Sequence, residues 1–475
     1  MSLLSRFKVT SHHDRSPLSL LIVLVGLGCA VAIGYLVGTD QFSYRILIIG
    51  FTLGAVLAAL IAGERGLYIG FLLWIGTFAL GYRTIRISPH FLLYPSEIVL
   101  WGLVGMIIIF RIIQPTFRPH YHWPSWLPWF IPFWFWGWIV GLGAGWPLDR
   151  IASDFRNFLL LIPMILVTSS MLAKPDRWPL ILATMVAVSI WISFWGSLEY
   201  LFPTIKNIFP GFITNPIPGL SQEGFMRAQF SFWGAAAATF ICAIFLPFNL
   251  VVWRQWKHLW LRILLLVVIG IQLFAIYIGG YRSIWLLTGI VIAVWLMYRV
   301  GMLFGSLLLA LFLGAYRFLP EPAQLRIDSL IVALEGSPID SSAAKRWDRV
   351  LETWQTAWQN PFGVGWSGTG WVHSDFIQIA ANLGLLAGLL FLGAYLFTLW
   401  RIWRHVQALP HDQRANSTGL TLLLAFIVVG GLLMFQGVQV LTQLILPVWL
   451  VWVLVEVWLK QHSKQQRTIP SRGLR

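Results

Sequence analysis

A histidine and an aspartate stand at the end of a glycine-rich segment in the C-terminal third of the chain. Residues 363–375 read Gly-Val-Gly-Trp-Ser-Gly-Thr-Gly-Trp-Val-His-Ser-Asp, and a long apolar run follows. A neutral imidazole at His373 could act as a general base near neutral pH. The backbone N–H groups at the start of the next helix could receive an anion. A lone histidine at a helix start is more often a cap, so its neighbours decide between the two readings.

Those neighbours favour a functional histidine. Gly363 and Gly365 belong to a run of four glycines in eight residues, which allows the backbone to approach a ligand closely. The run is not a Walker A loop, because no Gly-Lys-Ser/Thr follows it. Trp366 and Trp371 flank the run and could stack on sugars. Tryptophan is also common at membrane interfaces, and that explanation covers most of the 28 in this chain.

Two arginines stand at positions that need an explanation. Arg282 follows a Gly-Gly-Tyr stretch between two apolar runs. An arginine near bilayer depth costs about 2.5–3.5 kcal/mol on insertion scales, so it normally has a partner. An ion pair with Glu199 or Asp154 and a bound phosphate both remain open. Arg227 ends a segment rich in proline and glycine, 202–228, just before another apolar run.

A helical pattern precedes the glycine run. Residues 342–359 place Arg346 and Arg349 on a polar face. The apolar face carries residues at spacings of four, three and four, namely Trp347, Leu351, Trp354 and Trp358. This pattern predicts an amphipathic helix, which either lies at the membrane interface or packs on the helix bundle.

The elements that must position these residues are membrane helices. Of the 475 residues 58% are hydrophobic and 11% are charged, which excludes an ordinary soluble enzyme. Runs of about 20 apolar residues predict an all-α integral membrane protein, a polytopic bundle of about 12–14 transmembrane helices with a long periplasmic loop carrying amphipathic helices. The candidate runs are 18–38, 44–62, 66–82, 94–113, 126–145, 155–173, 178–201, 229–250, 259–279, 283–298, 301–319, 374–400, 418–437 and 441–459.

The net charge of +15 is explained by topology. With the N-terminus in the cytoplasm, the surplus of Lys and Arg falls on the cytoplasmic side, and outer charges balance. Both termini are then cytoplasmic, and a nucleic-acid partner is not needed. Many outer basic residues are arginines, which either pair with outer acids or bind a polyanion. We expect N-terminal helices at 1–201, central helices at 202–319, a large loop at 320–373, C-terminal helices at 374–460 and a basic tail at 461–475.

The chain from about 220 to 400 resembles the O-antigen ligase/polymerase superfamily in the order of its motifs. These motifs are Arg-Ala-Gln-Phe at 227–230, Gly-Tyr-Arg-Ser-Ile-Trp-Leu at 280–286, an Arg-Trp pair and a later Trp within 346–354, Asn-Pro-Phe-Gly-Val-Gly at 360–365, and His-Ser-Asp-Phe-Ile-Gln with Asn-Leu-Gly-Leu-Leu-Ala-Gly within 373–388. The family more often has Asn directly after the histidine, where this chain has Ser374.

The resemblance implies a GT-C-like bundle acting at the periplasmic face of the bacterial inner membrane. The donor would be a glycan on undecaprenyl diphosphate, and the acceptor a hydroxyl of a lipid, a glycan or a protein. Arg227 and Arg282 would hold the diphosphate and stabilise the leaving group. His373 would orient or deprotonate the acceptor, with inversion at the anomeric carbon. No metal and no cofactor are expected, because the arginines supply the countercharge.

The sequence offers three further candidate site residues. Asp375 is a candidate for holding the imidazole of His373 or for contacting sugar, and Arg346 and Arg349 are candidate substrate contacts. Two other classes of function remain open, a transporter and a structural subunit of a polysaccharide export system. A transporter should carry ionisable residues near mid-membrane. Glu199, Arg282 and Glu456 all lie near predicted helix ends, which favours chemistry at the membrane surface.

Overall fold

The computed structural model describes most of the chain beyond residue 62. The described residues are 63–79, 85–86, 92–114, 121–202, 235–255, 258–318, 341–410, 417–435 and 442–468, with residues 204, 230, 321, 324, 325, 328 and 414. The predicted runs 18–38 and 44–62, the segment 205–229 and the basic tail from residue 469 lie outside them. What is described is helical, apart from a two-residue antiparallel ladder of β1 (Ile85–Arg86) with β2 (Leu92–Leu93).

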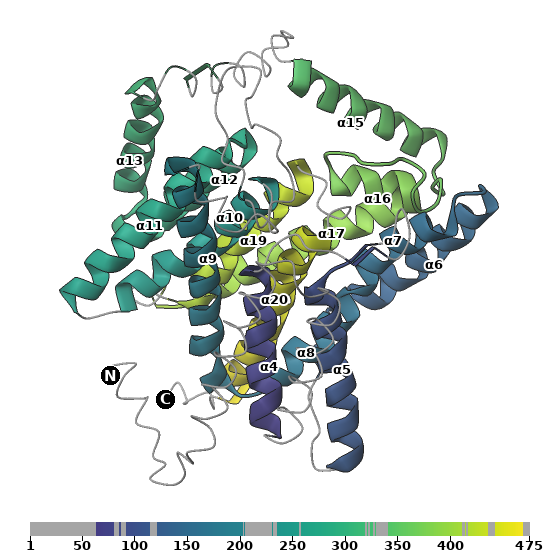
Figure 1. The fold of residues 1–475 in the computed structure, drawn as a ribbon, viewed down its shortest axis with the longest axis horizontal. Helices are drawn as coiled ribbons and strands as arrows, with labels where there is room; N and C mark the ends of the chain where they lie inside the picture. The colour runs from purple at the N-terminus through teal and green to yellow at the C-terminus, as the bar shows by residue number, and fades with distance from the viewer. Residues whose placement is uncertain are drawn as a thin grey trace, which may run out of the picture.

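Figure 1 shows the arrangement of the helices, most of which overlap predicted runs. In chain order they are α4 (Glu64–Gly76), α5 (Pro95–Ile113), α6 (Leu127–Gly143), α7 (Leu148–Leu159), α8 (Leu161–Met171), α9 (Trp178–Leu201), α10 (Ala235–Gln255), α11 (Leu259–Gly279), α12 (Arg282–Val300), α13 (Met302–Gly314), α15 (Ser341–Gln359), α16 (Asp375–Leu383), α17 (Leu385–Gln407), α19 (Thr418–Phe435) and α20 (Thr442–Thr468). Short 3₁₀ turns lie at Thr77–Ala79, Pro175–Arg177 and Ala315–Phe318.

Within the described residues, eight helical stretches are long and apolar enough to cross a membrane. They belong to α5, to α7 with α8, and to α9, α11, α12, α17, α19 and α20. Two further apolar helices, α6 and most of α10, are shorter. The chain is therefore a multi-pass helical membrane protein, as its composition predicts. The full count of 12–14 transmembrane helices remains a prediction.

One predicted span is wrong. The apolar run 374–400 is divided at Gly384 into the nine-residue α16 and the 23-residue α17. Gly384 has φ +105°, and a Cβ there would lie 2.8 Å from the carbonyl oxygen of Pro361. The break therefore needs glycine for both its conformation and its close contact. As a result His373 precedes a short packed helix and not the membrane-spanning helix itself.

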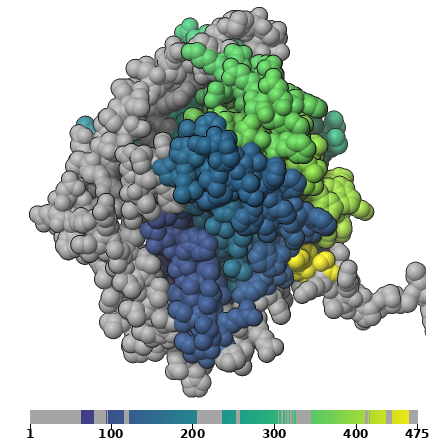
Figure 2. Space-filling model, turned by 90° about the vertical axis from the view of Figure 1, so that its right-hand side faces the viewer, coloured from purple at the N-terminus to yellow at the C-terminus, as the bar shows by residue number. Residues whose placement is uncertain are grey.

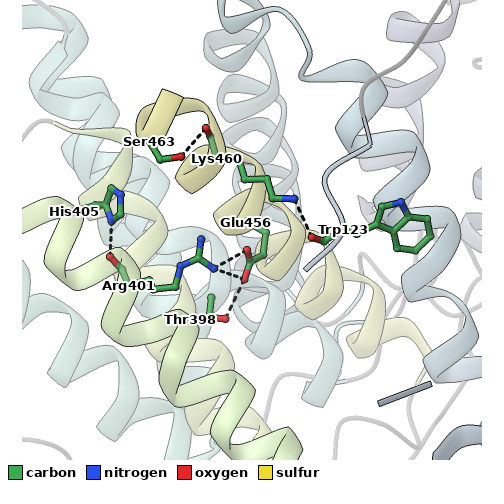
Figure 3. Close-up of polar contacts among 7 residues, drawn as sticks. All are labelled: Trp123, Thr398, Arg401, His405, Glu456, Lys460 and Ser463. Carbon is green, nitrogen blue, oxygen red and sulfur yellow. Dashed lines mark hydrogen bonds and ion pairs between the residues drawn. The ribbon is translucent and has the colours of Figure 1, made fainter. Parts of the chain in front are cut away.

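The core of the bundle is built around α20. The window Leu444–Ser463 is 89% buried, and α20 packs against α8, α10, α17 and α19. Its large side chains face all directions, which is typical of a central helix. Glu456 of α20 is 1% exposed and pairs with Arg401 of α17 at 3.1 Å, while Thr398 donates to the same carboxylate (Figure 3).

Candidate functional site

The segment between α15 and α16 docks onto α6 through tryptophan hydrogen bonds. The backbone N–H of Trp366 donates to the carbonyl of Gly137 at 3.0 Å, and its indole Nε1 donates to the carbonyl of Trp134 at 2.8 Å. The side chain of Trp366 is 1% exposed and packs on Phe158, with ring centroids 5.3 Å apart. Its burial contradicts the expected stacking of a sugar on Trp366, which instead anchors the segment.

Donors from the α6 side of the contact reach the segment as well. Trp136 Nε1 donates to the carbonyl of Phe362 at 2.7 Å, and Trp146 Nε1 to that of Val364 at 3.3 Å. Figure 2 shows the surface of α6 and α7, in blue, bordering that of α15 and the following segment, in green. The helix pair α6–α7 is therefore the platform on which the candidate site is built.

The close approach that the glycines allow is to protein backbone. Gly363 has φ +90°, and a Cβ there would collide with the carbonyl of Asn382. Gly365 has φ +83°, and a Cβ there would collide with the backbone of Gly141 in α6. The expectation that Gly363 and Gly365 make room for a ligand is therefore wrong for this structure, because α16 and α6 occupy that room.

Side-chain hydrogen bonds that the sequence did not indicate hold the rest of the segment in place. Ser367 Oγ donates to Asp154 Oδ2 of α7 at 2.8 Å, although the two residues are 213 positions apart. Thr369 donates to Asn382 Oδ1 at 2.9 Å, and Gln378 Nε2 donates to the carbonyl of Gly370 at 2.6 Å. Ser367 holds φ +68°, which is rare for a residue other than glycine. No spacing signal in the sequence could have paired these residues.

His373 lies half-buried at the end of this fastened segment. Its ring contacts that of Trp371, with centroids 4.7 Å apart and planes inclined by 48°, and Trp371 itself is 50% exposed. The Nδ1 atom of His373 is buried and has no hydrogen-bond partner among the described residues. Buried polar atoms are normally paired, so this nitrogen is a candidate for contact with a ligand.

The surroundings of His373 keep its imidazole neutral. Burial of the ring, and then the positive charge of Arg346, lower the pKa of His373 to about 4. At pH 7 the ring therefore carries no charge, and its unprotonated nitrogen can accept a hydrogen bond. Its basicity is lower than the sequence suggested, because the sequence could not show how far the ring is buried or that Arg346 lies near it.

Helix α15 lies over the segment and brings two arginines to it. Arg349 Nη2 donates to the carbonyl of Thr369 at 3.2 Å and also approaches Glu352 at 3.5 Å, so it holds the segment in place. Arg346 is exposed, and its charge acts on His373. The underside of α15 packs on α16 through Thr353 and Ala357, both buried.

The other predicted site residues fall elsewhere. Asp375 opens α16 and is 0% exposed, which does not suit contact with a sugar. Arg282 is the first residue of α12, after Gly280 in the left-handed conformation ends α11. Helices α12 and α16 both pack against α19. Arg227 lies outside the described residues.

One of the outer arginines pairs with an acid, which is the first of the two interpretations that the sequence left open. Arg156 of α7 approaches Glu97 of α5 at 3.6 Å, and both side chains are buried. The partner is on a neighbouring helix, at the predicted outer end of the run 94–113. This buried pair lies between α5 and α7.

Comparisons with known proteins do not assign the chain to a family. No family model matches the chain, and no curated protein matches it. Within the described residues, no group of three or more His, Cys, Asp or Glu side chains is arranged to hold a metal ion.

Proposed function

We propose that this chain is a membrane enzyme that transfers a glycan from undecaprenyl diphosphate to an acceptor hydroxyl. The observation that carries the proposal is the state of His373. It is a neutral imidazole with an unpartnered buried nitrogen, next to the cationic Arg346 and the exposed ring of Trp371. A buried nitrogen without a hydrogen-bond partner and a strongly shifted pKa both cost free energy, and both are typical of functional sites. The order of motifs in the sequence supports the choice of substrate.

In the proposed reaction the acceptor hydroxyl oxygen attacks the anomeric carbon of the donor sugar. The bond from that carbon to the diphosphate oxygen breaks, and the diphosphate leaves with the electron pair. The hydroxyl proton passes to His373. Arg346 attracts the anionic donor, and the bound diphosphate in turn offsets the charge of Arg346. The pKa of His373 then rises in the complex, which makes the ring a better base when the donor is present.

Arg282 and Arg227 have the remaining role in this proposal. Their guanidinium groups bind the diphosphate and stabilise the charge that develops on it during transfer. No metal is required, because the arginines provide the countercharge. Trp371, which is half-exposed beside His373, takes the place of Trp366 as the aromatic surface for a sugar.

The proposed location is the outer face of the bacterial inner membrane, with both termini in the cytoplasm. The distribution of Lys and Arg supports this orientation. The apolar stripe of α15 supports it as well, because Trp347 and Trp358 are each 62% exposed while the opposite face packs on α16. An exposed tryptophan stripe on an amphipathic helix suits the membrane interface.

Transfer in proteoliposomes tests the proposal. The donor is a defined undecaprenyl-diphosphate glycan, and candidate acceptors are supplied in turn. His373→Ala should lower the rate by roughly 10²–10⁴-fold, the usual contribution of a general base. His462→Ala is the matched control, because His462 also lies against a tryptophan ring, that of Trp458 at 4.3 Å, but in α20. Equal, measurable rates in the wild type and His373→Ala would remove the catalytic role of His373, and no transfer by the wild type would favour a structural subunit.

A further inference from the structure

Helix α17 has one exposed face that runs from its first turn to its last. The exposed residues recur at spacings of four, three, four, three and four, namely Leu386, Leu390, Gly393, Phe397, Trp400 and Arg404. These spacings place them on one side of a helix. Because α17 is long and apolar enough to cross a membrane, lipid chains cover this face. The face is apolar until its last member, which is an arginine.

Two arginines near the end of α17 differ in their partners. Arg401 pairs with Glu456 of α20 at 3.1 Å, so a carboxylate inside the bundle offsets its charge (Figure 3). Arg404 is exposed, and its guanidinium has neither a carboxylate nor a hydrogen-bond acceptor among the described residues. The charge of Arg404 is therefore available to a ligand at the membrane surface.

An aromatic ring holds the side chain of Arg404. Its guanidinium carbon lies 5.2 Å from the ring centroid of Trp400, one turn earlier on the exposed face. This cation–π contact orders a long side chain that would otherwise be flexible. The N–H donors of an arginine form a fixed fork that matches two oxygens of a phosphate. The exposed face thus ends in an ordered phosphate-binding group.

The turn that follows α17 adds a second positive charge. Arg414 Nε donates to the carbonyl of Leu409 at 2.7 Å, and Arg414 Nη1 donates to the side chain of Gln407 at 3.3 Å. Gln407 in turn donates to the hydroxyl of Tyr298 in α12 at 2.7 Å. These acceptors are uncharged, so they leave the charge of Arg414 without a counterion among the described residues. Basic sites of this kind between membrane helices suit anionic head groups.

This end of α17 lies at the membrane surface opposite to His373. Helix α17 begins directly after α16, which follows His373, and it has 23 residues. At 1.5 Å per residue it rises about 35 Å, which is enough to cross the hydrocarbon core. Arg404 is therefore remote from the proposed site of glycan transfer.

We propose that the end of α17 binds one anionic phospholipid of the bilayer, of the phosphatidylglycerol type. Its phosphate lies on the guanidinium of Arg404, and its acyl chains lie along the exposed face beyond Trp400. Charge complementarity selects this occupant, because the site has two cations and an apolar face. An arginine that only extends to the interface and stabilises a helix C-terminus would not distinguish an anionic lipid from a zwitterionic one. The inference uses neither His373 nor a glycan, so it stands or falls independently of the proposed function.

Photolabelling with matched lipids tests the inference. The full-length protein is placed in phosphatidylcholine nanodiscs that contain a small share of photoreactive phosphatidylglycerol or, separately, photoreactive phosphatidylcholine. Both probes carry the same diazirine near the glycerol end of an acyl chain. Mass spectrometry measures the label on peptides from residues 390–407, and the readout is the ratio of label from the anionic probe to label from the zwitterionic probe.

Arg404→Gln is compared with Arg111→Gln, which removes the same charge elsewhere. Arg111 is exposed in the last turn of the membrane-spanning α5 and contacts no aromatic ring in the described part of the chain. The comparison therefore separates a local site from the effect of total charge. Trp400→Leu keeps the charge of Arg404 and removes the ring that holds it.

We expect a ratio well above one in the wild type and in Arg111→Gln. Arg404→Gln should lower the ratio roughly fivefold, the usual attraction of one basic residue for an anionic membrane surface. Trp400→Leu should lower it as well, because the guanidinium is no longer held over the ring. A ratio near one in the wild type would overturn the site, and so would equal ratios in Arg404→Gln and Arg111→Gln. An unchanged ratio in Trp400→Leu would overturn the part assigned to the ring.

Discussion

At the scale of single residues, His373 owes its properties to its neighbours. The ring is half-buried against Trp371, its Nδ1 atom has no hydrogen-bond partner in the described part of the chain, and Arg346 is close enough to act on its charge. Each of these conditions disfavours the imidazolium form. The neutral ring is therefore a property of the fold, and removing one neighbour should change it.

The pKa of His373 gives the first residue-scale prediction. In the unfolded chain its pKa is near 6.5, and in the folded protein it is about 4. The folded state thus binds fewer protons between these values, so this contribution to stability is complete above pH 6.5 and is lost as the pH falls toward 4. Deuterium exchange at the imidazole C2 position, read by mass spectrometry, should report a midpoint near 4.

Replacing the neighbouring cation should move that midpoint upward. Arg346→Gln removes the positive charge while keeping an exposed polar side chain, so the pKa of His373 should rise toward its ordinary value. Arg404→Gln, an exposed arginine in α17 over the ring of Trp400, is the control and should leave the midpoint unchanged. An unchanged midpoint in Arg346→Gln would mean that burial alone sets the pKa.

At the scale of elements, the segment between α15 and α16 behaves as part of the packed core. Its backbone is bonded to α6 and α16, and its glycines let these backbones approach within contact distance. Rigid support of this kind holds a side chain in one orientation, which a catalytic base requires. The segment was predicted as a ligand-binding loop, and its glycines instead serve the docking that positions His373.

Gly365→Ala should test that docking. The substitution puts a Cβ on a residue with φ +83° and into the backbone of Gly141. The conformation alone costs about 1–2 kcal/mol, and the collision adds to it. We expect a lower thermal midpoint in detergent and faster proteolysis of the segment. Gly143→Ala, at the end of α6 where a Cβ meets no atom within 4 Å, should change neither. Identical behaviour of the two variants would show that the segment is not docked as described.

The polar groups between α9, α10 and α11 bear on the alternative of a transporter. Asn249 donates to Gln272 and, at 3.1 Å, to Ser189, and all three side chains are buried. These groups are uncharged and bond to one another. A transport pathway for an ion would instead require ionisable residues facing a cavity. This network is explained by helix association within the membrane.

At the scale of the whole molecule, a buried ion pair connects the central helix to the helix that follows the site. Arg401 of α17 and Glu456 of α20 have side chains 23% and 1% exposed, respectively. Thr398 adds a hydrogen bond at 3.1 Å to the same carboxylate (Figure 3). Because α17 begins directly after α16, the position of the site depends on how α17 packs against α20.

Breaking this pair should destabilise the protein strongly. Arg401→Leu leaves the carboxylate of Glu456 buried without its countercharge, which typically costs about 3–5 kcal/mol. The double variant Arg401→Leu/Glu456→Leu should recover most of the loss in the free energy of unfolding. Lys174→Leu is the control, since its pair with Glu64 is 57% and 40% exposed and should contribute less than about 1 kcal/mol. A loss in the double variant equal to that of the single one would contradict the pairing.

Much of the architecture could be predicted because membrane helices obey a local rule. A chain surrounded by hydrocarbon must satisfy its backbone within each helix, so long apolar runs report the helices directly. The run 259–279 coincides with α11, and the pattern at 342–359 differs from α15 by one residue at its start. The rule failed at 374–400, where Gly384 breaks the helix because α16 must turn to meet Pro361.

The sequence by itself determined the helical membrane class, the helix at 342–359 and the position of His373 just before a helix. The tertiary structure decided what surrounds that histidine. Asp154 and Ser367 come together across 213 residues, and Trp366 is buried while Trp371 remains half-exposed. Composition and periodicity report which solvent a segment prefers, but contacts between distant segments depend on shape and hydrogen bonding, which appear only when the chain is folded.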